Sequence, residues 1–312
     1  MSDIVTITPN PAVDVSTVVD RIVPVVKLRG TTQRRDPGGG GINVARVISR
    51  LGGDVTALYP VGGPTGLLLQ QLVEQEGVTS RTWATTEDTR EDFFVQERAT
   101  GQPYRFILPG PTLRESEWEA GLALLSSLDP FPRFVIGSGS LPRGVPTDFY
   151  ARVATLARSR GARFVLDSSG PALAAAVEGG VDMIKPSLHE MQELVGGALP
   201  DATAWEEAAR ALVAAGKAAM VALTMGHLGA LLVTSERVLR AQPLTMVPVN
   251  AVGAGDSFLG ALVAKLAAGA SVEDAFRFAV AAGAAALLRT GTALCDPADI
   301  TRLLADVRLE TA

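Results

Sequence analysis

The chain has 312 residues, of which 47% are hydrophobic and 20% charged, and its formal net charge is −5. This length and apolar content allow a large core and exclude a disordered or fibrous protein. An acidic chain lacks the clustered cations that hold phosphate polymers or anionic membranes, so we expect a small substrate, with no nucleic acid and no membrane partner.

Cysteine, histidine and targeting signals narrow the possibilities further. The N-terminus lacks the pattern of a signal peptide, and the longest nearly unbroken apolar run, 278–288, is too short for a membrane span, so we expect a cytoplasmic protein. The single cysteine, Cys295, excludes an internal disulfide and is expected to be a packed residue. Two histidines, His189 and His227, argue against a zinc site or a Ser-His-Asp triad.

Strand-like and helix-like segments alternate in the first part of the chain. Residues 3–8 and 55–61 read as strands, and 42–52 and 65–76 read as helices. From residue 130 onward the alternation continues, with strands predicted at 133–137, 163–167, 182–185 and 219–223. This order predicts βαβ units around a mainly parallel sheet.

Two stretches interrupt the alternation. Residues 12–36 and 89–108 read as strands without intervening helices, with a hairpin around 99–102. Such strands do not easily continue a parallel sheet. We therefore predict a small β-sheet lid over the carboxyl edge of the main sheet, where open α/β folds bind ligands, within a single domain of residues 1–312.

The segment DPGGGGINVARVISRLGG, residues 36–53, places four glycines directly before a helix. Glycines let backbone N–H groups approach a ligand, and a helix start favours anionic or hydroxyl-rich groups. A flexible loop is the simpler interpretation, but it would cost conformational entropy with no packing gain. We therefore predict a binding loop, in which Asn43 offers its amide to a sugar hydroxyl.

The segment NAVGAGDSFLGAL, residues 250–262, allows two interpretations. Asp256 can be part of an ordinary helix start after a glycine turn. Alternatively, Gly253, Ala254 and Gly255 supply N–H donors for a phosphate, and Asp256 is a base beside it. Neither the P-loop pattern nor G-x-G-x-x-G spacing is present, so a phosphate site here is built differently.

Both segments resemble the signatures of the ribokinase-type, or PfkB, carbohydrate kinases. The similarity extends through TPNPAVD (8–14), GSGSLPRGV (137–145), LDSSGPAL (166–173), IKPSLHE (184–190), LTMGHLGALLV (223–233) and GTALCD (291–296). It implies a ribokinase-like three-layer α/β/α fold with a β-sheet lid. Within the family the chain is most similar to the minor 6-phosphofructokinases, because Gly40 stands where 1-phosphofructokinases usually carry lysine.

This resemblance implies ATP-dependent phosphorylation of fructose 6-phosphate at its C1 hydroxyl, a glycolytic step. Asp256 would be the base, and the amides of Gly253, Ala254 and Gly255 would form the anion hole. The positions implied for the sugar and its phosphate are Asp14, Lys27, Gly38, Gly39, Asn43, Arg90 and Ser140, with Arg29 and Arg105 as weaker candidates. From the residues alone, Asp14 could be a turn residue and Lys27 and Arg90 solvated surface cations.

The resemblance also implies a nucleotide site and metal ions. The nucleotide positions are Lys185, Ser187, Thr224, Gly226 and Gly229, whereas His227 is expected to be a surface residue. Glu190 would order Mg²⁺ through water, in a family pattern N-x-x-E whose asparagine is here Ser187. Potassium is a further possibility, and the corresponding positions are Asn250, Val252, Ala286, Arg289, Gly291 and Ala293, where the charge of Arg289 argues against it.

Several alternatives remain open at this stage. The same chemistry could act on fructose 1-phosphate, tagatose 6-phosphate or a nucleoside, and the fold could serve a non-catalytic sugar-phosphate sensor. Exposed edges of the predicted lid and the behaviour of relatives lead us to expect a homodimer formed through the lid.

Overall fold

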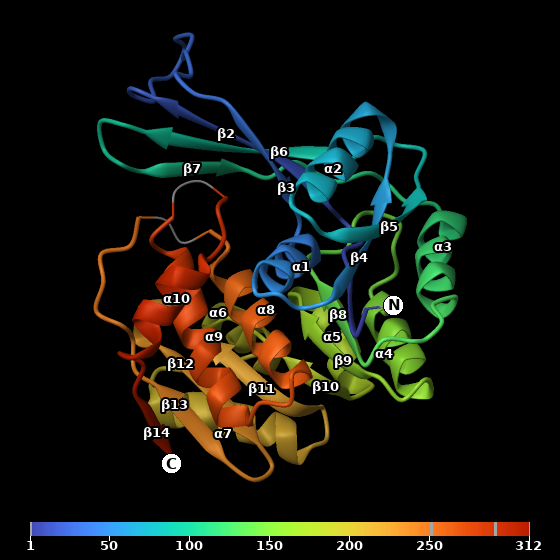
Figure 1. The fold of residues 1–312 in the computed structure, drawn as a ribbon, viewed down its shortest axis with the longest axis vertical. Helices are drawn as coiled ribbons and strands as arrows, with labels where there is room; N and C mark the ends of the chain where they lie inside the picture. Colours follow the sequence, from blue (N-terminus) through green and yellow to red (C-terminus); the bar gives the residue numbers. More distant parts are fainter. Residues whose placement is uncertain (1, 250–251, 290–291, 312) are drawn as a thin grey trace.

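One large sheet carries most of the fold (Figure 1). The computed structural model describes residues 2–249, 252–289 and 292–311. In spatial order the strands are β14 (Leu309–Thr311), β13 (Val238–Ala241), β12 (Ala230–Thr234), β11 (Ala218–Thr224), β10 (Val181–Ile184), β9 (Arg163–Asp167), β8 (Phe134–Ser138), β1 (Ile4–Ile7), β4 (Val55–Val61) and β5 (Thr79–Ala84). Neighbours from β11 to β5 pair in parallel, and those from β11 to β14 pair antiparallel. The predicted mainly parallel sheet is confirmed.

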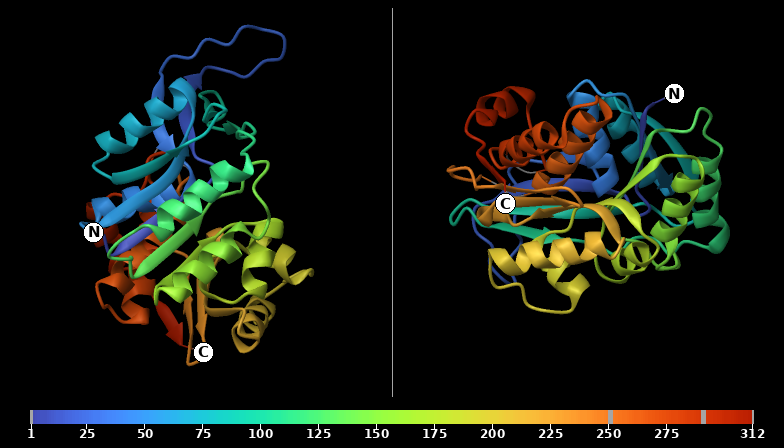
Figure 2. Two further views of the ribbon diagram at one scale, coloured as in Figure 1. Left: turned by 90° about the vertical axis from the view of Figure 1, so that its right-hand side faces the viewer. Right: turned by 90° about the horizontal axis from the view of Figure 1, so that it is seen from below.

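Helices cover both faces of this sheet, which gives the three layers seen in Figure 2, right. One layer contains α1 (Gly40–Arg50), α2 (Gly63–Gln75), α8 (Ala254–Ala267), α9 (Val272–Ala286) and α10 (Pro297–Leu304). The other contains α3 (Glu115–Ser126), α4 (Phe149–Ser159), α5 (Gly170–Glu178), α6 (Leu188–Val195) and α7 (Ala202–Ala214). A 3₁₀ turn, η1 (Gly226–Leu228), follows β11. No helix among the described residues is long and apolar enough to cross a membrane.

The helices α1 and α8 approach each other closely because a glycine lies between them. A Cβ atom on Gly260 would lie 2.8 Å from the Val47 side chain and 3.1 Å from the Val44 carbonyl. Side chains of α1, α8 and α9 share a buried apolar cluster, including Val47, Ala261 and Ala282. This packing brings the start of α1, after the glycine run, close to the start of α8.

A separate four-stranded sheet lies above the main one in Figure 1. Its order is β3 (Arg34–Gly38), β2 (Ala12–Val19), β6 (Arg90–Glu97) and β7 (Pro103–Phe106). β2 pairs parallel with β6 and antiparallel with β3, and β6 and β7 form the predicted hairpin. Both segments predicted as the lid therefore build one sheet, and its movement as a lid stays a prediction.

The segment 12–36, predicted as strands without an intervening helix, begins with β2 and ends within β3 and contains no helix. Residues 20–33 contain no strand and form a long loop that extends from the small sheet (Figure 2, left). Valines at 23, 25 and 26 imitate a strand pattern, but all three are exposed and the segment joins no sheet. Apolar alternation stabilises a strand only where a partner strand and a core receive it.

Candidate active site

The turn before α8 exposes backbone N–H groups at a helix start. Gly253 is the N-cap residue with φ of 76°, a left-handed conformation that favours glycine, and α8 begins at Ala254. The Leu294 side chain would lie 2.7 Å from a Cβ atom on Gly253, so the segment between α9 and α10 packs directly on this turn. The first N–H groups of a helix have no partner within it. The turn thus has the donors and the dipole of an anion site.

Asp256 lies in the first turn of α8 and contacts the glycine-run helix. Asn43 Nδ2 of α1 donates to Asp256 Oδ2 over 2.9 Å. Burial raises the pKa of the Asp256 carboxyl, and the hydrogen bond from Asn43 and the charge of Lys185 oppose this. The structure therefore joins Asn43 and Asp256, which are 213 residues apart, in one contact.

Lys185 and Asp167 form a buried ion pair next to the same turn. Lys185 Nζ lies 3.1 Å from Asp167 Oδ1 and would lie 3.3 Å from a Cβ atom on Gly255. Burial raises the pKa of Asp167 to about 6; Lys185 lowers it, and the charges of Asp256 and Glu190 raise it further. Burial lowers the pKa of Lys185, but Asp167 and Glu190 outweigh burial and leave it above its usual value. A cation is thus held against the anion turn.

Ser187 and Glu190 form a capping box at the start of α6. The Ser187 N–H donates to Glu190 Oε2 over 2.7 Å, and Ser187 Oγ accepts from the Glu190 N–H over 3.3 Å. The serine that departs from the family asparagine thus takes the N-cap position. Ser187 also pairs with Thr224 as an isolated parallel bridge.

The residues near this end of the sheet suit Mg²⁺ bound mainly through phosphates. The described residues contain no cluster of three or more His, Cys, Asp or Glu side chains that could enclose a metal ion. Glu190 and Asp167 are close enough to influence each other electrostatically. Mg²⁺ in phosphoryl-transfer sites commonly takes one or two carboxylates, with substrate phosphates and water completing its shell. These two carboxylates fit that requirement.

The glycine run is needed for space as well as for conformation. A Cβ atom on Gly38 would lie 2.3 Å from Asp14 Oδ1, and one on Gly40 would lie 2.3 Å from Ser138 Oγ. Gly39 has φ of 108° and packs on Thr8 and Pro11. The run therefore lies directly on the Asp14 carboxylate.

Asp14 belongs to a row of three buried acids across the small sheet. It is in register with Asp36 of β3 and Asp92 of β6. Burial, followed by the negative charge of Asp92, raises the pKa of Asp14 to about 7, and the guanidinium groups of Arg46 and Arg90 oppose this. Asp36 pairs with Arg34 and Asp92 accepts the Leu108 N–H, whereas the Asp14 carboxylate faces Gly38.

Arg90 and Ser140 both contact Asn10, a residue to which the sequence analysis assigned no role. Arg90 Nη2 donates to the Asn10 carbonyl over 3.2 Å, and Asn10 Nδ2 donates to Ser140 Oγ over 3.1 Å. Asn10 Oδ1 is buried and has no protein partner. Asn10 could have been found in the sequence from its place in the motif TPNPAVD, between the end of β1 and the start of β2.

The other predicted cations lie further from this cluster. Lys27 and Arg29 are exposed in the loop of residues 20–33, and neither forms a hydrogen bond or ion pair with another described residue. Arg105 stacks over the Phe94 ring, 5.1 Å from its centroid, and its charge reaches both Asp92 and Asp256. The structure therefore brings Arg90 and Arg105, but not Lys27 and Arg29, to the site.

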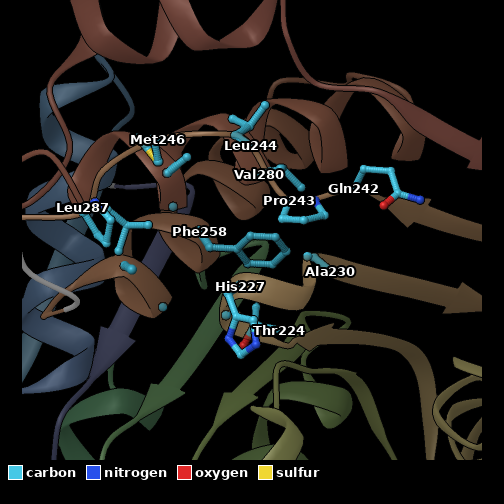
Figure 3. Close-up of a pocket in the computed structure, with 17 residues that line it drawn as sticks. Thr224, His227, Ala230, Gln242, Pro243, Leu244, Met246, Phe258, Val280 and Leu287 are labelled. Carbon is cyan, nitrogen blue, oxygen red and sulfur yellow. The ribbon is translucent and has the colours of Figure 1, made fainter. Parts of the chain in front are cut away.

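A cavity of about 430 Å³ borders the anion turn, and Figure 3 shows the side chains that line it. Ala254 and Gly255 line it together with three predicted nucleotide positions, Thr224, Gly226 and Gly229. Apolar side chains complete the wall, among them Leu244, Met246, Phe258, Val280 and Leu287. His227 is exposed, as predicted, but also lines this cavity. The cavity has the size and lining of a small-molecule site.

The positions predicted for potassium are only partly described. Asn250 and Gly291 lie outside the described residues. Ala286 is buried, and the Ala293 carbonyl would lie 4.0 Å from a Cβ atom on Gly253. Arg289 pairs with Asp296 and Asp299, so two carboxylates balance the charge that argued against a cation here. Val252 precedes the anion turn in sequence.

Cys295 is buried, as the sequence predicted. Burial raises the pKa of its thiol, and a hydrogen bond with Ser257 opposes this only in part. A buried thiol with a raised pKa is a poor nucleophile.

A family model described as "pfkB family carbohydrate kinase" matches residues 5–299 of the chain. The chain belongs to this family of carbohydrate kinases. An ATP-dependent 6-phosphofructokinase isozyme 2 from Mycobacterium tuberculosis is 43% identical over 96% of this chain and 88% of its own. The protein of the same name from Escherichia coli is 40% identical over 98% of this chain and 99% of its own.

Solved structures agree with this assignment. The phosphofructokinase-2 from Escherichia coli in complex with fructose-6-phosphate matches this kinase with a TM-score of 0.92, at 39% identity over 98% of this chain and 99% of that one. Its complex with potassium gives a TM-score of 0.94 over the same shares. The ribokinase-like fold predicted from the sequence is confirmed.

Proposed function

We propose that this enzyme transfers the γ-phosphate of ATP to the C1 hydroxyl of fructose 6-phosphate and produces fructose 1,6-bisphosphate and ADP. One observation carries the proposal: Ala254 and Gly255 line the apolar cavity, and the next residue, Asp256, contacts Asn43 beside the glycine run. A nucleotide on one side of the turn and a sugar on the other would meet at the Asp256 carboxylate.

The nucleotide would lie in the cavity beside η1. Its apolar wall suits a purine ring, and Thr224, Gly226 and Gly229 line the part next to the end of β11. Lys185, held by Asp167, supports the phosphates at the anion turn. Glu190 and Asp167 would hold Mg²⁺ and its waters, and the ion would neutralise charge on the phosphates. Ser187 fixes the Glu190 carboxylate through the capping box.

The sugar would lie between the glycine run and the small sheet. Asp14 and Asn43 accept and donate hydrogen bonds to its hydroxyls, Gly38 and Gly39 allow its close approach, and Ser140 borders the same space. Two related proteins act, by their names, on fructose phosphates, and one has been solved with fructose-6-phosphate. The substrate's own phosphate needs permanent cations. Arg90 supplies one within the described site, and Lys27 supplies another when its loop approaches.

The chemical step assigns one task to each group. A carboxylate oxygen of Asp256 takes the proton of the C1 hydroxyl as that oxygen forms its bond to the γ-phosphorus. The bond from this phosphorus to the β–γ bridging oxygen breaks, and ADP leaves with the electron pair. The N–H groups of Gly253, Ala254 and Gly255, together with Lys185, stabilise the negative charge on the transferring group.

Potassium and a second subunit complete the proposal. The loop that packs on Gly253 would hold K⁺ with backbone carbonyls, as a related structure was solved with potassium. A homodimer would form through the small sheet, whose loop of residues 20–33 leaves Val25 and Val26 exposed and whose strand β7 ends at Phe106, which is exposed together with Ile107.

A substrate panel tests the proposed activity. Purified enzyme with ATP and Mg²⁺ is assayed for kcat/KM on fructose 6-phosphate, fructose 1-phosphate and tagatose 6-phosphate, with ADP formation as the readout. We expect the highest kcat/KM on fructose 6-phosphate. A higher value on fructose 1-phosphate would overturn the proposed substrate, and binding of sugar phosphate without ATP consumption would indicate a sensor.

A further inference from the structure

Arg46 is a buried cation to which the predicted chemistry assigns no task. It lies on α1 and has no exposed surface, which is true of no other charged residue in the described parts of the chain. A charge is taken out of water only at a large cost unless it is well paired. The contacts that Arg46 makes therefore indicate what it does for the molecule.

The Arg46 guanidinium joins three segments of the chain. Nη1 donates to the Pro37 carbonyl over 3.1 Å and to Asn43 Oδ1 over 3.0 Å. Nη2 donates to Glu76 Oε1 over 3.0 Å and lies 4.0 Å from Asp36 Oδ1. Glu76 ends α2, and Pro37 and Asp36 belong to the small sheet. The contacts with Glu76 and with the Pro37 carbonyl thus fix the guanidinium in the position from which it binds Asn43.

The contact with Asn43 determines which way the asparagine amide faces. A guanidinium has only donors, so the Asn43 oxygen must point to Arg46 and the NH₂ group must point away from it. That NH₂ group is the one that donates to Asp256 Oδ2. Asn43 and Arg46 are three residues apart, on one face of α1, which makes this relay possible.

We infer that Arg46 is a positioning residue, which holds the Asn43 amide in the orientation that binds one oxygen of Asp256 and leaves the other free for the substrate proton. This inference rests on the proposed role of Asp256 as the base. Without Arg46, the Asn43 amide can turn and present its oxygen to the carboxylate, and the two oxygens would repel each other. The base would then lose its orientation without any change in the nucleotide cavity.

Arg46 also acts on Asp256 through its charge. Burial raises the pKa of the Asp256 carboxyl, and the Arg46 charge lowers it, as do the Asn43 hydrogen bond and the charges of Lys185 and Arg105. The nearby Asp167 carboxylate adds a negative charge to these surroundings. Loss of the Arg46 charge should therefore move the acid limb of the kcat–pH profile to higher pH. A residue that only supported the fold would not cause this shift.

The test compares Arg46→Lys with Arg50→Gln, a control at the second arginine that pairs with Glu76. Lysine keeps the charge but cannot hold the Pro37 carbonyl, Asn43 and Glu76 together, so we expect kcat to fall about 10-fold to 100-fold, with little change in the KM for ATP. Arg50 contacts Glu76 Oε2 over 2.6 Å and does not touch Asn43. Arg50→Gln should therefore lower the melting temperature and leave kcat close to the wild-type value.

A second variant keeps the test decisive if Arg46→Lys fails to fold. Arg46→Gln with Glu76→Gln replaces the buried ion pair with neutral amides, and we expect a lower kcat together with an acid limb at higher pH. Wild-type kcat and pH profile in a folded Arg46 variant would overturn the inference, provided that Asp256→Asn is inactive. An active Asp256→Asn variant would instead contradict the proposed base, so failure of the proposed function can be distinguished from failure of the Arg46 inference.

Discussion

At the residue scale, the site depends on carboxylates whose surroundings differ. Asp256, Asp167 and Asp14 are all partly or fully buried, and each has its pKa raised. Only Asp167 has an ion-pair partner among the described residues, namely Lys185. Asp256 has one amide donor, and Asp14 lies against Gly38 without a side-chain hydrogen bond to any described residue. Such unpaired carboxylates are expensive for the fold and are suited to binding polar ligands.

The Asp14 pKa gives a prediction for stability against pH. Its ordinary value of 3.8 is raised to about 7. Between these two values the unfolded chain has released the proton while the folded chain keeps it, so the free energy of unfolding should fall as pH rises from about 4 to about 7. Asp14→Asn should reduce this fall, measured by urea unfolding at several pH values.

The raised pKa of Asp167 also makes the free energy of unfolding fall with rising pH, by a smaller amount. Some dependence of this free energy on pH should therefore remain in Asp14→Asn. The control is Asp20→Asn, because the Asp20 side chain is 80% exposed and should leave the slope unchanged. An Asp14→Asn profile parallel to that of the wild type would contradict the pKa assignment.

At the element scale, the sequence predicted the regular segments better than the contacts between them. The strands at 55–61 and 163–167 and the helix after Asp256 agree with β4, β9 and α8, because their apolar periodicity coincides with burial. The bounds of the loop at 20–33 were not predicted within the segment 12–36, since a strand pattern does not reveal whether a partner strand exists.

The site shows the same division between local and long-range information. Motif residues such as Asp14, Asn43 and Asp256 were identified from their segments. The relay through Arg46 and the Asn10 contacts with Arg90 and Ser140 could not be predicted, because they depend on how α1, the small sheet and the loops pack together. A buried arginine inside a helix gives no local signal that separates it from a surface cation.

The capping box of α6 gives a prediction that separates stability from metal binding. Ser187→Ala removes the N-cap acceptor and should lower the free energy of unfolding by about 1 kcal/mol. It should also raise the Mg²⁺ concentration needed for half-maximal activity, because Glu190 is then held less firmly. Denaturant unfolding measures the free energy, and titration of the kinase rate with Mg²⁺ measures the concentration for half-maximal activity.

Ser271→Ala is the matched control, since Ser271 caps α9 by accepting from the Asp274 N–H. It should cost a similar free energy of unfolding with no change in Mg²⁺ dependence. Equal Mg²⁺ curves for the two variants would show that Ser187 only stabilises the helix.

At the scale of the whole molecule, the small sheet leaves apolar side chains in contact with solvent. Val25, Val26, Phe106 and Ile107 lie on its loop and edge and are all more than half exposed. Val25 also has φ of 69°, a costly conformation for a β-branched residue. Exposed apolar side chains of this kind are typical of an interface, and they are the basis of the proposed homodimer.

Phe106→Glu should therefore convert a dimer to a monomer, because a buried unpaired carboxylate would oppose association. The measurement is molar mass by light scattering after size-exclusion chromatography. Leu67→Glu changes a side chain on α2 that is 62% exposed, compared with 52% for Phe106, and should leave the dimer intact. A monomeric wild-type protein, or a dimeric Phe106→Glu variant, would contradict this interface.

The central claim is that Asp256 removes the C1 proton of fructose 6-phosphate while ATP donates its phosphate. Phosphorus NMR of the products, formed by the wild type and by Asp256→Asn with ATP and Mg²⁺, tests it most directly. The wild type should give fructose 1,6-bisphosphate and ADP in equal amounts, and the folded variant should form them about 10² to 10⁴ times more slowly. Near-normal turnover in Asp256→Asn, or a different bisphosphate from the wild type, would contradict the claim.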